Sequence, residues 1–102
     1  MADIIRHSGF VSFCPADNPI PWYTTKEDNE IIRLKDYDGQ HRNANSIFFQ
    51  AKDVTIYIKP GNSKYCLVID PYHSYEYNYE RISEFQVIAP IGTSLRWYAQ
   101  FF

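Results

Sequence analysis

Residues 94–102 read Ser-Leu-Arg-Trp-Tyr-Ala-Gln-Phe-Phe, and their side chains alternate between apolar and amphipathic. In a β-strand, every second residue lies on the same face. The apolar set, which suits a core, comprises Leu95, Trp97, Ala99 and Phe101. The amphipathic set comprises Arg96, Tyr98, Gln100 and Phe102. The stretch therefore predicts a strand with one buried face and one partly exposed face.

More short strands are predicted between residue 46 and this stretch, because runs of β-forming residues alternate there with turn signals. They cover residues 46–50, 54–59, 65–70, 74–80 and 82–88. Pro60 and Gly61 suit the two central positions of a type II turn, where glycine accepts the positive φ of the second. Short strands at this spacing are typical of an antiparallel β-sandwich or barrel.

The first half of the chain is poorer in strand patterns. Residues 9–14 could form an edge strand, whereas residues 14–21 hold three prolines and predict a loop. Residues 36–45 are polar and predict an exposed loop. Residues 26–34 fit either a helix or a strand, and we favour the strand.

These patterns together predict one all-β domain over residues 1–102. We expect an antiparallel β-sandwich, jelly-roll-like or barrel-like, with a loop-rich N-terminal third. Residues 1–45 would form a loop-rich arm with edge strands, and residues 46–102 the strand-rich core. A chain of 102 residues can bury one hydrophobic core without metals or disulfides.

Composition and charge limit the partners that we expect. Aromatic residues make up 18% of the chain, which suits both sheets and protein interfaces. The formal net charge is −2 and no Lys/Arg cluster occurs, so we expect no nucleic-acid binding. No apolar run approaches the ~20 residues of a membrane helix, and the N-terminus lacks the apolar core of a signal peptide. We therefore expect no membrane partner and a cytoplasmic origin.

The two cysteines are Cys14 and Cys66. Cys66 lies within the apolar run of residues 65–69, which predicts a buried, reduced thiol. A Cys14–Cys66 disulfide is the alternative, and the missing signal peptide argues against it.

Residues 74–80 alternate strictly and place Tyr75, Tyr77 and Tyr79 on one face, just after Tyr72. Three interpretations of these rings remain open. They could cover the core or the surface of the sheet. They could form a protein contact, since tyrosine offers area and a polar tip at low entropy cost. They could also stack on carbohydrate, with Trp22 contributing.

Catalytic and metal-binding motifs are missing from the sequence. His7, His41 and His73 have no metal-ligand spacing, and the Asp36-Tyr-Asp38-Gly motif lacks the later carboxylate of a calcium loop. Paired carboxylates could come from residues that we predict to face solvent, namely Glu76, Glu80 and Glu84. No nucleophile motif or phosphate-binding loop appears. We therefore expect no enzyme activity, no metal and no cofactor.

Four pieces of the second half share a recurrent rhythm. The first is Ser46-Ile-Phe-Phe, and the second is a strand that ends at Pro60-Gly61. The third is Tyr-Cys-Leu-Val-Ile-Asp-Pro-Tyr-His-Ser, over residues 65–74. The fourth is Ile-Ser-Glu-Phe-Gln-Val-Ile, over residues 82–88, followed by Gly-Thr-Ser-Leu-Arg-Trp-Tyr-Ala, over residues 92–99. In this rhythm, residues 46–102 resemble small bacteriophage virion structural proteins of β-sandwich type. Tyr72 and His73 depart from the pattern, which more often has glycine and glutamate there.

The resemblance implies a structural virion component, such as a capsid decoration protein, a neck or tail accessory protein or a fibre base. It would form homo-oligomers and contact other virion proteins. It would be found in the virion, which is assembled in the host cytoplasm. The candidate interface residues are Tyr72, Tyr75, Tyr77, Tyr79, Arg96, Tyr98 and Phe102. The alternative is a carbohydrate-binding module with a site formed by Trp22, Tyr75 and Tyr77.

Overall fold

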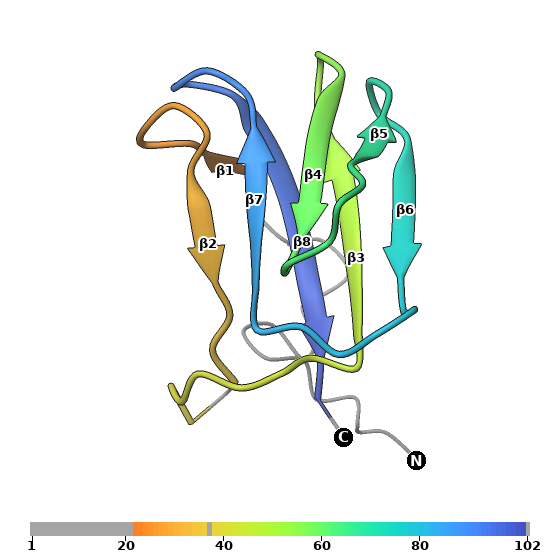
Figure 1. Cartoon of the computed structure of the whole chain (residues 1–102). Coiled ribbons are helices and arrows are strands. Elements are labelled where there is room, and N and C mark those ends of the chain that lie inside the picture. Colours follow the sequence, from red (N-terminus) through yellow and green to blue (C-terminus); the bar gives the residue numbers. More distant parts are fainter. Residues whose placement is uncertain (1–21, 37, 102) are drawn as a thin grey trace, which may run out of the picture.

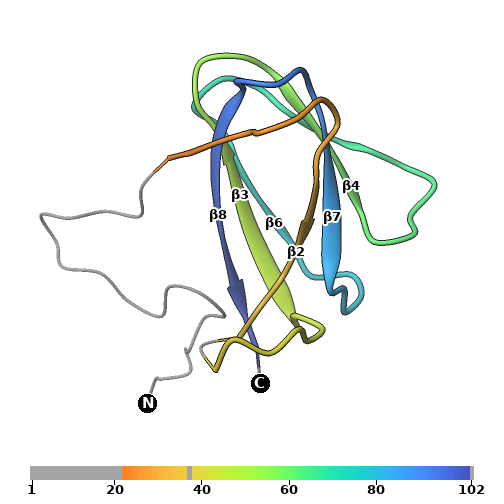
Figure 2. The same cartoon turned by 90° about the vertical axis from the view of Figure 1, so that its left-hand side faces the viewer.

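The computed structural model describes residues 22–36 and 38–101, and eight strands within them form two antiparallel sheets (Figure 1). The first sheet has the order β1 (Tyr23–Thr24), β8 (Ser94–Gln100), β3 (Ser46–Ala51) and β6 (Ser74–Tyr77). The second has the order β2 (Ile31–Arg33), β7 (Glu84–Ile88), β4 (Ile56–Pro60) and β5 (Leu67–Ile69). The sheets lie as two facing layers (Figure 2), which confirms the predicted all-β sandwich.

The core lies between the sheets and is built by alternate residues of the facing strands. In β8, Leu95 and Ala99 are fully buried, and Phe101 just after the strand is nearly so, as the alternation of residues 94–102 predicts. Trp97 is only partly buried, and its ring packs edge-on against Phe85 of the second sheet. The other large buried side chains include Phe49, Leu34, Ile47, Ile56, Ile58 and Val87.

Most strands are shorter than the sequence predicts, because regular pairing with the neighbouring strand ends earlier. The structure shortens the predicted strand at residues 65–70 to β5, the one at residues 74–80 to β6, and the one at residues 82–88 to β7. Residues 26–34 contain β2, so the preference for a strand there is confirmed. The described residues form no helix, and hence none that could cross a membrane. The predicted edge strand at residues 9–14 and the loop at residues 14–21 lie outside the described residues.

The turn after β4 differs from the predicted one by one position. The Ser63 amide donates to the Pro60 carbonyl at 3.0 Å, so Pro60 begins the turn and Gly61 takes its first central position. Gly61 has φ +52°. The prediction of Pro60 and Gly61 as the two central residues is therefore wrong, because Pro60 still belongs to β4 and pairs with Phe85.

Residues 36–45 form a more ordered loop than their polar composition suggests. The Asp36 carboxylate is buried and accepts bonds of 2.9 Å from the amides of Asp38 and Gln40. Arg42 pairs with the same carboxylate at 3.0 Å. The pKa of the Asp36 carboxyl group is lowered, mainly by the hydrogen bond from the Gln40 amide and also by Arg42, although burial acts in the opposite direction. The expectation of an exposed loop thus fails at Asp36.

Cys66 is an exposed, free thiol, so the expectation of a buried thiol is wrong. The reason is strand parity: Leu67 packs against the core and Ile69 is buried, which leaves Cys66 and Val68 on the outer side. Cys14, the partner of the alternative disulfide, lies outside the described residues.

Candidate interaction surfaces

The predicted interface residues fall on opposite faces of the first sheet. In β3, Ile47 and Phe49 are buried in the core, and they pair with Tyr77 and Tyr75 of β6. These two tyrosines therefore turn inward. Residues of the opposite parity turn outward, and they include Phe48, Gln50, Glu76, Arg96 and Tyr98.

The outer face of the first sheet carries an aromatic face, which we define as Trp22, Phe48, Gln50, Arg96 and Tyr98. Phe48 and Tyr98 lie on paired strands with ring centroids 5.1 Å apart. Arg96 Nε donates to Gln50 Oε1 at 2.8 Å, and its guanidinium lies 4.2 Å from the centre of the Trp22 ring. All five side chains are half-buried.

Charge and burial act together on this face. The pKa of Tyr98 is raised, mainly because its hydroxyl group is buried and also because the negative charge of Glu76 lies nearby. Lys52 adds a second cation, with Nζ 5.7 Å from the centre of the Trp22 ring. A cation near an indole stabilises its position by about 0.5–1 kcal/mol at an exposed site. Trp22 is therefore held in place by Arg96 and Lys52.

The tyrosines of residues 72–79 occupy the β6 edge of the sandwich. Tyr77 is buried, and Tyr75 is half-buried and packs against the core. Tyr79 is 77% exposed, and it receives a hydrogen bond of 3.4 Å from the Tyr75 hydroxyl. This bond is the main cause that raises the pKa of Tyr75, whereas burial is the main cause for Tyr77. Tyr72 lies in the preceding turn and is 62% exposed.

The structure does not bring the candidate residues into one site. Tyr75 and Tyr77 line the inner side of β6, whereas Trp22 lies with Arg96 on the outer face, so the three form no common carbohydrate platform. Of the candidate interface residues, Arg96 and Tyr98 share the aromatic face, and Tyr72 and Tyr79 are the most exposed rings. Phe102 lies outside the described residues.

The outer face of the second sheet carries a surface that sequence reasoning missed. Tyr57 of β4 pairs with Val68 of β5 on one side and Ile88 of β7 on the other. Ile31 of β2 lies in the next row, opposite Gln86. We call Ile31, Tyr57, Val68 and Ile88 the apolar band.

A sequence signal for the apolar band exists. Residues 56–58 (Ile-Tyr-Ile) and 67–69 (Leu-Val-Ile) are apolar at three consecutive positions. Because strand residues alternate between faces, such a run must place apolar side chains on both faces.

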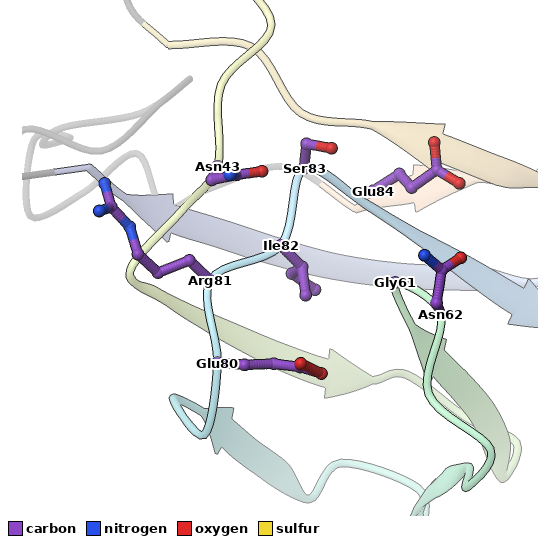
Figure 3. A pocket seen from close by; sticks show the side chains of 8 residues that line it. All are labelled: Asn43, Gly61, Asn62, Glu80, Arg81, Ile82, Ser83 and Glu84. Atoms are coloured by element: carbon purple, nitrogen blue, oxygen red, sulfur yellow. The ribbon is translucent and has the colours of Figure 1, made fainter.

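An open hollow of about 440 Å³ lies at the end of the sandwich where β7 begins (Figure 3). Its lining comprises Asn43, Gly61, Asn62, Glu80, Arg81, Ile82, Ser83 and Glu84. Figure 3 shows Ile82 near the middle, with Glu80 below it and Glu84 and Asn62 to one side, while Arg81 points away. Two of the three predicted carboxylates, Glu80 and Glu84, thus line the same hollow, whereas Glu76 lies elsewhere and accepts a bond of 2.8 Å from Ser46.

Comparisons with known proteins add no family to these observations. No family model matches the chain, and neither a curated protein nor a solved structure matches it significantly. Among the described residues, no group of three or more His, Cys, Asp or Glu side chains is placed to hold a metal ion.

Proposed function

We propose that this protein is a structural subunit of a bacteriophage particle and acts through contacts with other virion proteins of the capsid, neck or tail. The proposal combines the resemblance of residues 46–102 to virion β-sandwich proteins with one structural observation. That observation is the apolar band on the outer face of the second sheet. The protein would be assembled in the host cytoplasm and have no enzymatic role.

An antiparallel sheet with one face in water usually carries polar side chains on that face. In the apolar band, Ile31, Tyr57 and Val68 keep 54%, 45% and 62% of their surface exposed. Covering the exposed half of such a side chain contributes about 1 kcal/mol. Permanent subunit interfaces are more apolar than transient ones, so a face of this composition suits a protein that stays in its assembly.

The aromatic face supports the same proposal from the other side of the molecule. Tryptophan, tyrosine and arginine are the residues that contribute most often to binding energy at protein interfaces. Here Trp22, Arg96 and Tyr98 lie on one sheet face and are held by defined contacts. A subunit with contact surfaces on both sheets can join two neighbours at once, as a repeating assembly requires.

The test is to measure incorporation of the protein into particles. Particles purified from the host that carries the gene are probed for the chain, and the Tyr57→Ser and Val68→Ser variants are compared with Tyr65→Ser. Tyr65 is 80% exposed and lies outside the apolar band, so it is the matched control. We expect the first two variants to be depleted from particles and the control to be retained. Absence of the unmodified chain from particles contradicts the proposal.

Carbohydrate binding is the second candidate function, and the polar hollow favours it. Two carboxylates and two amides, from Glu80, Glu84, Asn43 and Asn62, line one concave site. Sugar hydroxyl groups bind side chains of this kind, which donate and accept hydrogen bonds. A glycan array with the unmodified chain and the Asn62→Ala and Glu84→Gln variants tests this function. Binding that both variants leave unchanged counts against the hollow.

A further inference from the structure

The apolar band has charges of opposite sign at its two ends. Asp70 follows Val68 by two residues on the outer side of β5, and it accepts a hydrogen bond of 3.2 Å from Thr55. Asp28 lies at the same end on the β2 side, where its carboxylate accepts a bond of 2.8 Å from the Ile91 amide. This is the acidic end of the second sheet.

Basic side chains lie toward the opposite end of the same face. Lys59 is two residues from Tyr57 in β4 and pairs with Gln86. Arg33 is two residues from Ile31 in β2 and pairs with Glu84. Lysines at the acidic end point elsewhere, since Lys52 contacts the Trp22 ring on the first sheet. Glu84 is the cross-strand neighbour of Arg33 on this face and offsets its charge, so the polarity along the strands comes from Lys59 at one end and Asp70 at the other.

We propose that the apolar band is the interface of a homodimer, with a twofold axis that lies in the interface and runs along the row of Val68, Tyr57 and Ile88. The inference rests on the proposed function and names a second copy of this chain as the occupant of this face. In such an isologous contact, each residue on the axis meets its own counterpart. Three apolar side chains then cover one another across the axis.

The charges select this orientation of the axis. Because the axis crosses the strands, it places the acidic end of one copy on the basic end of the other. Lys59 then faces Thr55 of the second copy and lies diagonally across from Asp70, which accepts the hydrogen bond of that Thr55. An axis parallel to the strands would instead bring the two acidic ends together, and like charges at an interface are unfavourable. The face is thus self-complementary in only one of the two arrangements.

A charge-swap series tests the pairing of Lys59 with Asp70. Sedimentation equilibrium measures the dimer dissociation constant of the full chain and of Lys59→Asp, Asp70→Lys and the double variant. We expect each single reversal to weaken the dimer at least tenfold and the double variant to recover most of the loss. Lys52→Glu, on the aromatic face, is the control and should have no effect. Thermal unfolding of each variant confirms that the fold is retained.

A cross-linking experiment tests the position of the axis. In a Cys14→Ser/Cys66→Ser background, Val68→Cys places the single thiol of the chain on the axis, so mild oxidation should give a disulfide-linked dimer. The Cys14→Ser chain should not cross-link through Cys66, because Cys66 lies two residues away from the axis row and faces the acidic end of the other copy. Cross-linking through Cys66 but not through the Val68→Cys variant overturns the proposed axis.

The outcomes separate this inference from the proposed function. A chain that is monomeric at the highest soluble concentration, or a double variant that does not recover, overturns the homodimer. If that chain is still found in particles, the apolar band is covered by another virion protein and the proposed function stands. A dimer that meets all these expectations but is absent from particles leaves the inference intact and contradicts the virion function.

Discussion

The ring of Phe49 meets the ring of Phe85 edge-on, with centroids 4.8 Å apart and an interplanar angle of 78°. Phe49 belongs to β3 of the first sheet and Phe85 to β7 of the second, and both are almost fully buried. Phe85 also meets Trp97 of β8 at 5.4 Å. These three rings therefore connect the two layers of the sandwich.

The first prediction concerns this contact. Phe49→Ala and Phe85→Ala should each lower the free energy of unfolding by about 3–5 kcal/mol, because each leaves a cavity in the core. A double-mutant cycle should give a coupling energy of about 0.5–1.5 kcal/mol for the pair. Urea unfolding measures both quantities. Phe48→Ala, on the outer face of the same strand, is the control and should cost less. Strict additivity of the two core variants contradicts the direct contact.

The second prediction concerns the turn after β4. An alanine at Gly61 meets two problems: the φ of +52° and an Ile82 methyl carbon 3.0 Å from the new Cβ. Gly39 also has a positive φ, of +80°, but its Cβ would meet nothing within 4 Å. Left-handed backbone costs a non-glycine residue roughly 1–2 kcal/mol. Gly61→Ala should therefore lower the unfolding free energy more than Gly39→Ala does. Equal losses would show that the contact with Ile82 is unimportant.

The third prediction concerns Tyr72, which has φ +62° at the second central position of a turn that begins at Asp70. Glycine is the usual residue at such a position in a type II turn. Tyr72→Gly should therefore leave the melting temperature unchanged or raise it, because the relief of strain offsets the added freedom of the unfolded chain. Tyr57→Gly, inside β4, is the control and should be destabilising. A clear loss of stability in the Tyr72 variant contradicts this interpretation.

The fourth prediction concerns alkaline pH. Burial, followed by a hydrogen bond to Glu30, raises the pKa of Tyr23 to about 12. The unfolded chain loses this proton near pH 10, so the stability that depends on it is complete below about pH 10. It is lost as the pH rises through about 12. In Tyr23→Phe, unfolding free energy should change less over this range than in the unmodified chain. A fall of the same size in both proteins contradicts the assignment.

The sequence allowed the sandwich and the inner face of β8 to be predicted, because the apolar set of residues 94–102 is unmistakably more apolar than the amphipathic set. The tyrosine strand shows the limit of this reasoning. Tyr75 and Tyr77 do share a face, but the alternation of side chains along the strand does not by itself reveal which face is turned to the core. That is decided by pairing with Ile47 and Phe49 of β3, which are distant in sequence.

The errors at strand ends and at Cys66 have related causes. Residues 65–70 are all compatible with a strand, yet only Leu67–Ile69 find a partner, in β4. The exposure of Cys66 and Val68 follows from their parity on that short strand. The apolar band was missed because an apolar run was taken to mean burial, whereas a strand that carries such a run is apolar on both faces.

The most direct test of the central claim is to compare the surface of the chain inside and outside the assembly. Hydroxyl-radical labelling measures the modification rate of Tyr57 in purified particles and in the isolated chain, diluted until it is monomeric. Tyr65, outside the apolar band, is the reference. We predict that Tyr57 is modified several-fold more slowly in particles, relative to Tyr65. An equal relative rate in both states would show that the apolar band stays in water and would contradict the claim.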